Sequence, residues 1–461
     1  MLFNSLNFFI FLAVFIFIYF LLFGKLRLIF CLLSSYFFYC FFSFKFSLII
    51  IVSTLIDFII GKKIGGEKNP NNRKIYLSIS LFLNLIILGI FKYFNFFIDS
   101  FLIFLSLFGL NISYTALSIA LPVGISFYTF QSMSYSLDVY YRRCKVENCF
   151  IRFATFVSFF PQLVAGPIVR AKRLLPQFRI NKSFKWSNLF LGCEYIIFGF
   201  FLKICVADRL GIIIDPTFIS PQSYGGGAHI IASVGFSFQI YADFAGYSLI
   251  AIGIGRLLGF NFGVNFKRPY FAFSFQDFWR RWHISLSSWL RDYLYIPLGG
   301  NKFGIFIKYR NFIIVMFLGG LWHGASINFL IWGVLHGILL ILNDLMKKNF
   351  FFISPNIFNK FTVFLTVTLL WIPFRSENLD VVMTKLLKIS STDNFLQNIS
   401  YDLFNTVIAF TMVIIFLSKD FIDEKKIRLN KRLRIFLSLV FVWLISFLGV
   451  FEGSNFIYFR F

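Results

Sequence analysis

Two of the four histidines in the chain lie in motifs whose residue types could carry out acyl chemistry. The first is His323, in the sequence LWHGAS, where it stands in an apolar tract. Burial in a low dielectric disfavours imidazolium and keeps a histidine neutral, and a neutral imidazole is a good general base near pH 7. His323 could therefore remove the proton of a hydroxyl as its oxygen attacks an acyl carbonyl, or could accept the acyl group itself.

The surroundings of His323 favour a functional role. Three nearby glycines predict a break between two apolar half-helices at 311–318 and 327–342: Gly319, Gly320 and Gly324. Broken helices at membrane depth occur only where they line a cavity or are buried in protein. The alternative is a core histidine that bonds to a backbone carbonyl. His336 would point to another face of a continuous helix, so we interpret it as structural.

The second candidate is His283, in the sequence RRWHISLSSW. It stands beside an apolar stripe that recurs at helical three- and four-residue steps: Trp279, Trp282, Leu286, Trp289 and Tyr293. Such a stripe, with charges such as Arg281 off it, predicts one amphipathic helix that lies flat at the membrane surface. Taken alone, His283 is then an interfacial histidine with no special role.

Polar residues also lie in the apolar segment 236–260, including Gln239 and Asp243. Since a charged side chain in the bilayer is costly, Asp243 either lines a water-filled cavity or makes a hydrogen bond between closely packed helices. Both interpretations stay open. Besides the histidines, the side chains that we expect to bind substrate or to line a tunnel are Trp322, Asp243, Tyr241, Gln239, Arg281, Trp282 and Asn328.

No motif of a soluble enzyme competes with the histidines. The chain has no GxSxG nucleophile elbow, no P-loop and no dinucleotide-binding glycine pattern after a strand. The six cysteines form no CxxC pair, so we expect no zinc site and no permanently bound cofactor. The chain therefore offers a base without an evident serine nucleophile, and the reacting hydroxyl or thiol must come from a substrate.

The elements that position these residues are predicted to be membrane-spanning helices. Hydrophobic residues make up 58% of the chain, so part of the apolar surface must face lipid. Uncharged tracts long enough to cross a bilayer, such as residues 1–23, recur along the chain. We predict an all-α, multi-pass membrane protein of about 11 spans with additional re-entrant or interfacial helices. It forms a single domain over residues 1–461, with core motifs in 121–345.

The net charge of +24 would suggest a nucleic-acid partner in a soluble protein, but here the basic residues gather in short loops. The loops at 61–74, 170–185 and 425–434 fit the positive-inside rule, which assigns such loops to the cytoplasm. We therefore expect no nucleic-acid partner. The same charge could meet membrane lipid headgroups or an anionic substrate.

Six sequence blocks, taken in order along nearly the whole chain, resemble one known family. They are LPVGISFYTFQSMSYSLDVYYR, SFFPQLVAGPIVR, QIYADFAGYSLIAIGIGRLLGF, FWRRWHISLSSWLRDYLYIPLGGN, MFLGGLWHGASINFLIWGVLHG and the tail SNFIYFRF. They look like the membrane-bound O-acyltransferase family, and most like its bacterial alginate O-acetyltransferase branch, which includes proteins of peptidoglycan O-acetylation. One departure is Leu249, which stands where relatives tend to have an acid and leaves Asp243 as the remaining polar group there.

The resemblance implies a helical bundle with a central tunnel, in the bacterial cytoplasmic (inner) membrane. It implies that His323 is catalytic and that His283 is a second signature histidine towards the cytoplasmic side. The acyl donor in this branch is usually cytoplasmic acetyl-CoA. The acyl group often passes to a separate periplasmic or extracellular partner protein that esterifies a polysaccharide, such as alginate or peptidoglycan.

Two alternatives remain open. D-alanyl transfer to teichoic acid, in the same family, would require docking of a folded carrier protein. A non-enzymatic multi-span transporter, in which His323 only gates protons, would lose flux but no covalent acylation when this residue is replaced. The enzymatic interpretation requires a channel that reaches the imidazole of His323 from one face of the membrane.

Overall fold

The computed structural model describes residues 1, 3–110, 112, 114, 120–164, 166–348, 356–392, 394–398, 402–451 and 456–457. Over these residues the regular structure is helical and no strand occurs, which confirms the predicted all-α class. The physical reason is the apolar composition. In lipid a backbone N–H or C=O finds no water, and a helix satisfies both groups within one segment.

Seven helical segments of the described chain are long and apolar enough to cross a membrane. They are Phe44–Gly66, Pro70–Ser106, Trp186–Ile219, Gly304–His323, Ile327–Lys347, Ile357–Arg375 and Leu403–Glu424. The chain is thus a multi-pass membrane protein, as predicted. The other spans of the about 11 expected would have to come from shorter or more polar helices, such as α1 (Leu6–Leu21), and that number stays a prediction.

The described residues form two compact units, and the predicted single domain stays a prediction. The first unit comprises Met1–Cys193 and Ala251–Gly263. Its elements are α1, α2 (Gly24–Cys40), α3 (Phe44–Gly66), α4 (Pro70–Leu88), η1 (Gly89–Tyr93), α5 (Phe94–Ser106), α6 (Ile125–Tyr140), α7 (Phe150–Ser158), α8 (Phe160–Leu163), α9 (Ala171–Leu174) and η2 (Leu175–Arg179).

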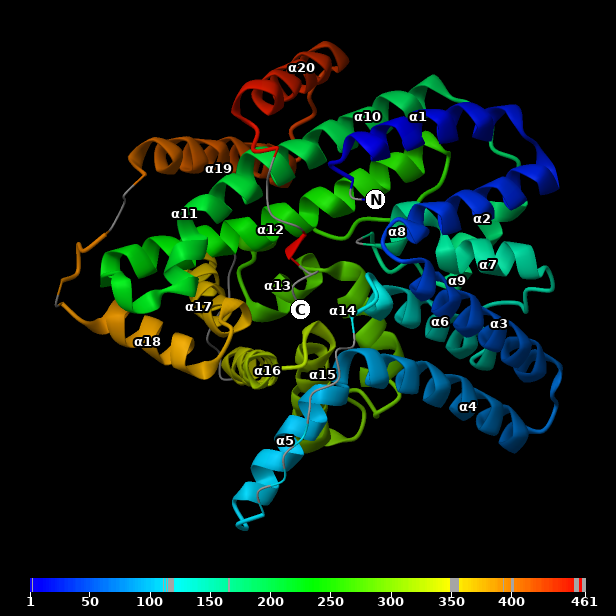
Figure 1. Ribbon diagram of the computed structural model, residues 1–461, viewed down its shortest axis with the longest axis horizontal. Helices are drawn as coiled ribbons and strands as arrows, with labels where there is room; N and C mark the ends of the chain where they lie inside the picture. The colour runs from blue at the N-terminus through cyan, green and yellow to red at the C-terminus, as the bar shows by residue number, and fades with distance from the viewer. Residues whose placement is uncertain are drawn as a thin grey trace. The chain divides into compact units, whose positions relative to one another are not determined.

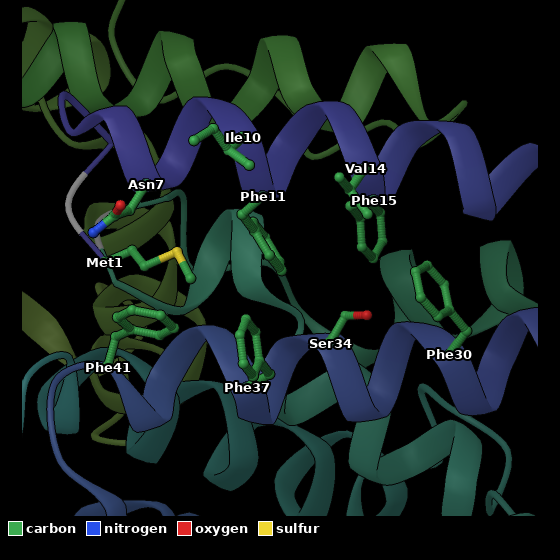
Figure 2. Close-up of a pocket in the computed structure, with 10 residues that line it drawn as sticks. All are labelled: Met1, Asn7, Ile10, Phe11, Val14, Phe15, Phe30, Ser34, Phe37 and Phe41. Carbon is green, nitrogen blue, oxygen red and sulfur yellow. The ribbon is translucent and has the colours of Figure 1, made fainter.

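The first unit carries an apolar groove of about 430 Å³, lined by side chains of the N-terminal segment, α1 and α2 (Figure 2). Phenylalanines dominate its lining, and the hydroxyl of Ser34 is one of its few polar groups. Neither a histidine nor a carboxylate is among its lining residues, so the groove offers no general acid or base. The chemistry-bearing residues lie instead in the second unit.

The second unit comprises Glu194–Ile250 and Val264–Phe461. Two helices contribute residues to both units: α10 (Trp186–Phe200) and α12 (Gly226–Leu257). Its other elements are η3 (Phe201–Ala207), α11 (Asp208–Ile219), η4 (Pro221–Ser223), η5 (Pro269–Phe271), α13 (Phe275–Arg281), α14 (Ile284–Leu290), η6 (Arg291–Tyr295), α15 (Gly304–His323), α16 (Ile327–Lys348), α17 (Ile357–Arg375), α18 (Leu379–Ser390), α19 (Leu403–Glu424) and α20 (Lys431–Leu448).

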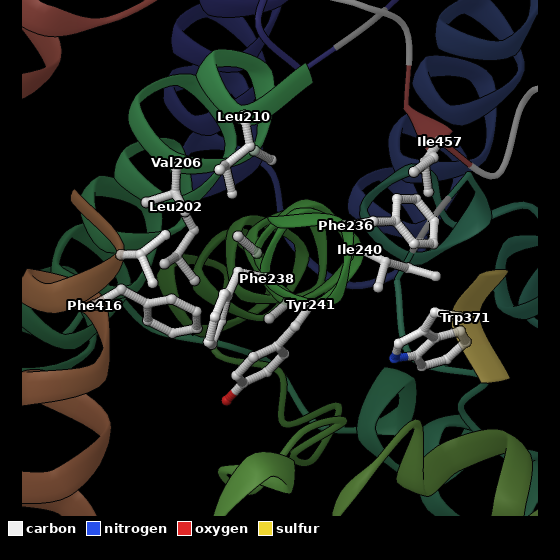
Figure 3. Packing of buried hydrophobic residues seen from close by; sticks show 14 of the residues in the cluster. Leu202, Val206, Leu210, Phe236, Phe238, Ile240, Tyr241, Trp371, Phe416 and Ile457 are labelled. Carbon is white, nitrogen blue, oxygen red and sulfur yellow. The ribbon is translucent and has the colours of Figure 1, made fainter. Parts of the chain in front are cut away.

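The core of the second unit packs around α12. This helix is apolar on all sides, as expected of a helix with packed neighbours rather than one solvated face. Figure 3 shows Phe238 and Tyr241 of α12 among side chains from neighbouring helices, including Trp371 of α17 and Phe416 of α19. These residues are buried, so α12 is a fixed support for the loops and helices that follow it.

Helices α15 and α16 form a hairpin whose closest approach requires glycine (Figure 1). A Cβ at Gly320 would lie 2.2 Å from the carbonyl oxygen of Phe329, and a Cβ at Gly333 would lie 2.3 Å from that of Met316. Small residues at such a crossing let two backbones touch. The predicted break near His323 is confirmed, but it separates two full helices rather than two half-helices.

The aromatic stripe at 279–293 does not lie on one helix, which corrects the prediction of a single flat amphipathic helix. The helix ends at Arg281, and a second one begins at Ile284. Between them His283 has a φ of 40°, in the left-handed region that a non-glycine residue rarely adopts. Four residues of the stripe are nevertheless buried, so the stripe faces protein: Trp282, Leu286, Trp289 and Tyr293.

Candidate active site

His283 is held by hydrogen bonds from the loop that precedes α13. Its Nδ1 lies 3.2 Å from Oδ1 of Asn265, which also accepts from the backbone N–H of Ser285 at 3.2 Å and from its hydroxyl at 2.9 Å. The backbone N–H identifies this atom of Asn265 as the amide oxygen. Nδ1 of His283 must therefore carry the hydrogen of a neutral ring, and Nε2 carries the lone pair.

The support of His283 continues through Asn265 into α12 and along the backbone. Nδ2 of Asn265 donates to the hydroxyl of Ser248 at 3.0 Å. The backbone N–H of Ile284 donates to the carbonyl oxygen of Asn265 at 2.8 Å, which holds the chain next to the left-handed residue. The ring of His283 is thus fixed in position by contacts with two separate stretches of the chain.

Burial keeps His283 uncharged. The residue is 1% exposed, and desolvation lowers the pKa of its imidazole to about 3. The ring also packs edge-on against Phe244 of α12, with ring centroids 4.6 Å apart. At neutral pH the residue is therefore a neutral base with one defined tautomer, and not the interfacial histidine that its sequence context alone suggested.

His323 is the last residue of α15, where the chain leaves the helix. Gly324 follows in an extended conformation, and a Cβ there would lie 2.1 Å from the ring of Phe329. The imidazole packs edge-on against Trp332 of α16 and Phe374 of α17, with ring centroids 5.2 Å away in both cases. It is 3% exposed, and the central tunnel stays a prediction.

Trp322 connects the two histidines. Its indole centroid lies 5.8 Å from that of His283 and 5.0 Å from that of His323. The structure thus brings together the two residues that the sequence analysis selected, although His283 lies between α13 and α14 and His323 ends α15. Both imidazoles are buried against one aromatic side chain, which gives a water-poor environment for proton transfer.

Two other predicted residues lie in the aromatic core next to this pair. Trp282 is fully buried, with its ring 5.0 Å from Trp371 and 6.0 Å from Tyr241. The hydroxyl of Tyr241 donates to a carboxylate oxygen of Asp420 on α19 at 2.7 Å. Trp282 directly precedes His283, and Tyr241 packs against Trp282. Their predicted role in lining a tunnel stays a prediction.

Asp243 takes part in a buried charge network rather than standing alone. Nζ of Lys203 lies 2.9 Å from Oδ1 of Asp243 and 2.7 Å from Oδ1 of Asp208. The other carboxylate oxygen of Asp243 accepts from the backbone N–H of Ile457 at 2.7 Å. These contacts agree with the helix-connecting interpretation of Asp243. Of the tail motif SNFIYFRF, only residues 456–457 belong to the described chain.

The neighbours of Asp243 on α12 show no second acid. Leu249 is half-buried and packs against the apolar core of the unit. Gln239 is buried, and a Cβ at Gly211 of α11 would lie 3.0 Å from its amide nitrogen. Gln239 is therefore next to α11.

Arg281 and Asn328 each lie near the end of a helix, and each side chain bonds to a residue at the end of another helix. The guanidinium of Arg281 pairs with Asp277 at 2.9 Å and with Glu424, the last residue of α19, at 3.0 Å. Nδ2 of Asn328 donates at 2.8 Å to the carbonyl oxygen of Ser376, which follows α17. Contact of either side chain with a substrate stays a prediction.

His336 lies nearer to His323 than a continuous helix would place it, and its structural role stays a prediction. The reason is that the chain reverses after Gly324. As a result, the ring of Trp332 lies 5.2 Å from His323 and 4.7 Å from His336. His336 is fully buried, one aromatic ring away from the other histidine.

Sequence reasoning missed the residues that orient the candidate bases. Asn265 lies outside the quoted sequence blocks, and Ser248 lies within one but has no evident role there, because the importance of both arises from contacts with residues distant in the sequence. Only one feature of the sequence could have identified Ser285 as a neighbour of His283, namely its position two residues later. The aromatic neighbours Trp332 and Phe374 could have been identified only as core residues.

The arrangement provides two buried imidazoles in an aromatic environment. Such a base can remove a proton from a hydroxyl or thiol during attack on a carbonyl carbon. Within the part of the chain that the structure describes, no three His, Cys, Asp or Glu side chains gather closely enough to hold a metal ion. Proton transfer and nucleophilic catalysis are reactions that the two imidazoles can support.

Comparisons with known proteins agree with this chemistry. Residues 149–373 match the membrane-bound O-acyltransferase family. A probable alginate O-acetylase of Pseudomonas putida is 41% identical over 380 residues, which cover 81% of this chain and 76% of that protein. A peptidoglycan O-acetyltransferase of Helicobacter pylori is 37% identical over 397 residues, 80% and 73% of the two chains. A teichoic acid D-alanyltransferase of Streptococcus thermophilus is 32% identical over 244 residues, 49% and 58%.

Proposed function

Because this chain belongs to the membrane-bound O-acyltransferase family, we propose that it takes acetyl groups from cytoplasmic acetyl-CoA for O-acetylation of a cell-envelope polysaccharide. The chain is an acyltransferase embedded in a membrane, as its motifs suggested. We place it in the bacterial cytoplasmic membrane, where it moves the acetyl group across to a periplasmic or extracellular partner protein. The observation that carries the proposal is that one indole, that of Trp322, lies next to both His323 and His283.

His323 is the general base of the proposed reaction. A hydroxyl oxygen of the acceptor attacks the carbonyl carbon of the thioester while the imidazole of His323 takes the hydroxyl proton. As the C–O bond forms and the C–S bond breaks, CoA leaves as a thiolate and takes the proton from the imidazolium. The products are an acetyl ester and the thiol of CoA, and the histidine is returned to its neutral form.

His283 is the positioning residue of the pair. Its ring cannot rotate freely, because Asn265 fixes Nδ1 and Phe244 packs against the ring. The proposal assigns it to the side from which the donor arrives. Arg281, two residues before it, pairs with Glu424, which directly precedes the basic loop 425–434 that the positive-inside rule assigns to the cytoplasm.

His323 lies at the end of α15, close to α16 and α17. It contacts Phe374, near the end of α17, and Asn328 of α16 bonds to the residue that follows α17. In the proposed reaction, a donor that enters near Arg281 and an acceptor that approaches from the opposite membrane face meet at His323.

Acetyl transfer is favoured over D-alanyl transfer by the extent of similarity. The probable alginate O-acetylase and the peptidoglycan O-acetyltransferase match about four-fifths of this chain, and the teichoic acid D-alanyltransferase matches 49% of it. Both acyl groups would use the same base. The donor, rather than the site geometry, therefore distinguishes the two functions.

The test is transfer of label by the purified full chain in lipid nanodiscs. Radiolabelled acetyl-CoA is supplied with a candidate acceptor protein or polysaccharide, and the ester product is quantified. The wild type should transfer the label, and His323→Ala should transfer it at least about 100-fold more slowly, the scale of a lost general base. The matched control is His229→Gln, a buried histidine whose Nε2 bonds to the carbonyl oxygen of Pro221. Transfer from a D-alanyl carrier alone, or wild-type transfer by His323→Ala, would overturn the proposal.

A further inference from the structure

A cluster of buried nitrogen atoms lies between α13 and α16. Helix α13 ends two residues before His283, and α16 carries His336. Five nitrogens have no hydrogen-bond partner among the residues that the structure describes: Nε1 of Trp279, Nε1 of Trp332, Nδ1 and Nε2 of His336, and Nδ2 of Asn343. We call these four residues the α13–α16 seam. The side chains of His336 and Asn343 are 0% and 1% exposed, so bulk water does not satisfy them.

The four residues of the seam are neighbours in the packing between α13 and α16. Residues 332, 336 and 343 recur at steps of four and seven, which places them on one face of α16. The ring of His336 lies 4.7 Å from Trp332 and 5.0 Å from Trp279, nearly perpendicular to both. Oδ1 of Asn343 accepts from the backbone N–H of Phe275 at 3.1 Å and so ties this face to the start of α13.

Unpaired buried nitrogens are costly, and native proteins keep few of them. Five in one seam therefore indicate a guest that bonds to them. The balance of groups identifies its chemistry. The two indoles and the amide nitrogen of Asn343 can only donate, and a neutral imidazole donates once and accepts once. Because donors outnumber acceptors, the seam fits a guest that presents an oxygen with lone pairs.

The position of the seam connects it to the candidate catalytic base. Trp332 belongs to the seam and also contacts His323, with ring centroids 5.2 Å apart. At the other end of the seam, Lys347 of α16 bonds to Gln276 of α13 at 2.8 Å. Gln276 is next in sequence to Asp277, which pairs with Arg281. The seam thus leads from the expected donor side towards His323.

We propose that the α13–α16 seam binds the carbonyl oxygen of the acyl thioester, with His336 as the residue that positions it. The proposal rests on the proposed function, because it takes the donor to be a thioester. The seam holds the acyl group one aromatic ring away from His323 before transfer. His336 takes no part in bond breaking, so it affects donor affinity more than the rate of the chemical step.

The experiment uses the purified full chain in nanodiscs and compares acetyl-CoA with CoA as ligands. The two ligands differ only in the acyl group. A site that binds the acyl carbonyl oxygen should therefore raise the melting temperature of the protein more with acetyl-CoA than with CoA. His336→Phe keeps a ring of similar size and removes both nitrogens. The matched control is Ile338→Phe, which adds a ring on a partly exposed position two residues along α16.

In His336→Phe we expect the preference for acetyl-CoA over CoA to vanish and the KM for acetyl-CoA to rise about tenfold, with kcat within a factor of about three. The melting temperature without ligand should be unchanged or higher, because two unpaired nitrogens are removed. A purely structural histidine would give the opposite, a lower melting temperature and an unchanged KM. Trp279→Phe, which removes one N–H and keeps a ring, should raise the KM about threefold.

Each outcome decides the inference separately from the proposed function. If His336→Phe keeps the preference for acetyl-CoA, the seam holds only water and the inference is overturned. If that variant fails to fold, an unchanged KM in Trp279→Phe overturns it instead. A wild type without any preference for acetyl-CoA also overturns it. A wild type that shows the His336-dependent preference but forms no ester supports the seam and contradicts the proposed function.

Discussion

The imidazoles of His283 and His323 contact the same indole ring, although forty residues separate them in the sequence. His283 is fixed by side-chain hydrogen bonds, whereas His323 is enclosed by aromatic rings at the end of a helix. The pair thus combines a base at a helix break with a partner of defined tautomer. A change that releases His283 should affect transfer without removing the base itself.

Asn265→Ala should lower kcat/KM about tenfold to a hundredfold, the usual effect of losing the group that orients a functional histidine. The reason is that Oδ1 of Asn265 is the acceptor that fixes Nδ1 of His283. Ser248→Ala removes only the bond to Nδ2 of Asn265 and should cost a few-fold. Steady-state transfer by the two variants tests this order, and equal activities would refute the orienting role.

Asn265→Asp should make transfer sensitive to pH. In the wild type, burial lowers the pKa of His283 to about 3, so this residue stays neutral from pH 5 to 8. A carboxylate beside Nδ1 favours the imidazolium and raises that pKa. Because the neutral ring is the working form, the variant should lose activity as pH falls through the raised pKa and regain it at higher pH. Superimposable pH profiles of kcat/KM for the two proteins would contradict a neutral His283.

Asp243→Asn should weaken the fold more than the reaction. The change removes one of two carboxylates paired with Lys203 and keeps the size of the side chain. We expect a loss of about 1–3 kcal/mol in the free energy of unfolding. The kcat/KM per folded molecule should stay within about threefold. Thermal unfolding in detergent and transfer assays check this. Unchanged stability with lost transfer would instead make Asp243 a tunnel residue.

Gly320→Ala should separate α15 from α16 and displace His323. Its Cβ would lie 2.2 Å from the carbonyl oxygen of Phe329, a backbone atom that cannot move alone. Overpacking of this kind destabilises by about 1–3 kcal/mol. Gly319→Ala is the control, because its Cβ would meet only the end of the Leu290 side chain at 3.3 Å. The melting temperature and the transfer rate should fall in the first variant and stay near wild type in the second.

The fold class and the membrane character followed from local properties of the sequence. The apolar tracts predicted helices, and the glycines around His323 predicted the break that ends α15. The break at His283 gave no such signal, since a left-handed φ at a histidine depends on the loop that packs against it. The single flat helix predicted there was wrong for this reason.

The candidate site could be predicted only in part. Sequence motifs identified both histidines, because each motif is short and continuous. The contact of both with Trp322, the support from Asn265 and the nearness of His336 all depend on how distant segments pack. His336 is the clearest example. We expected it to lie apart from His323 on the assumption of one continuous helix, but the chain reverses between α15 and α16.

The most direct measurement of the central claim is the content of O-acetyl esters in envelope polysaccharide of cells that produce His323→Ala in place of the wild type. We expect these esters to disappear while the amount of membrane-inserted protein stays unchanged. The reason is that the variant lacks the imidazole of His323 but keeps the hairpin of α15 and α16. His283→Ala should leave a small residue of esters. A normal ester content in cells with His323→Ala would contradict the assignment of His323 as the catalytic base.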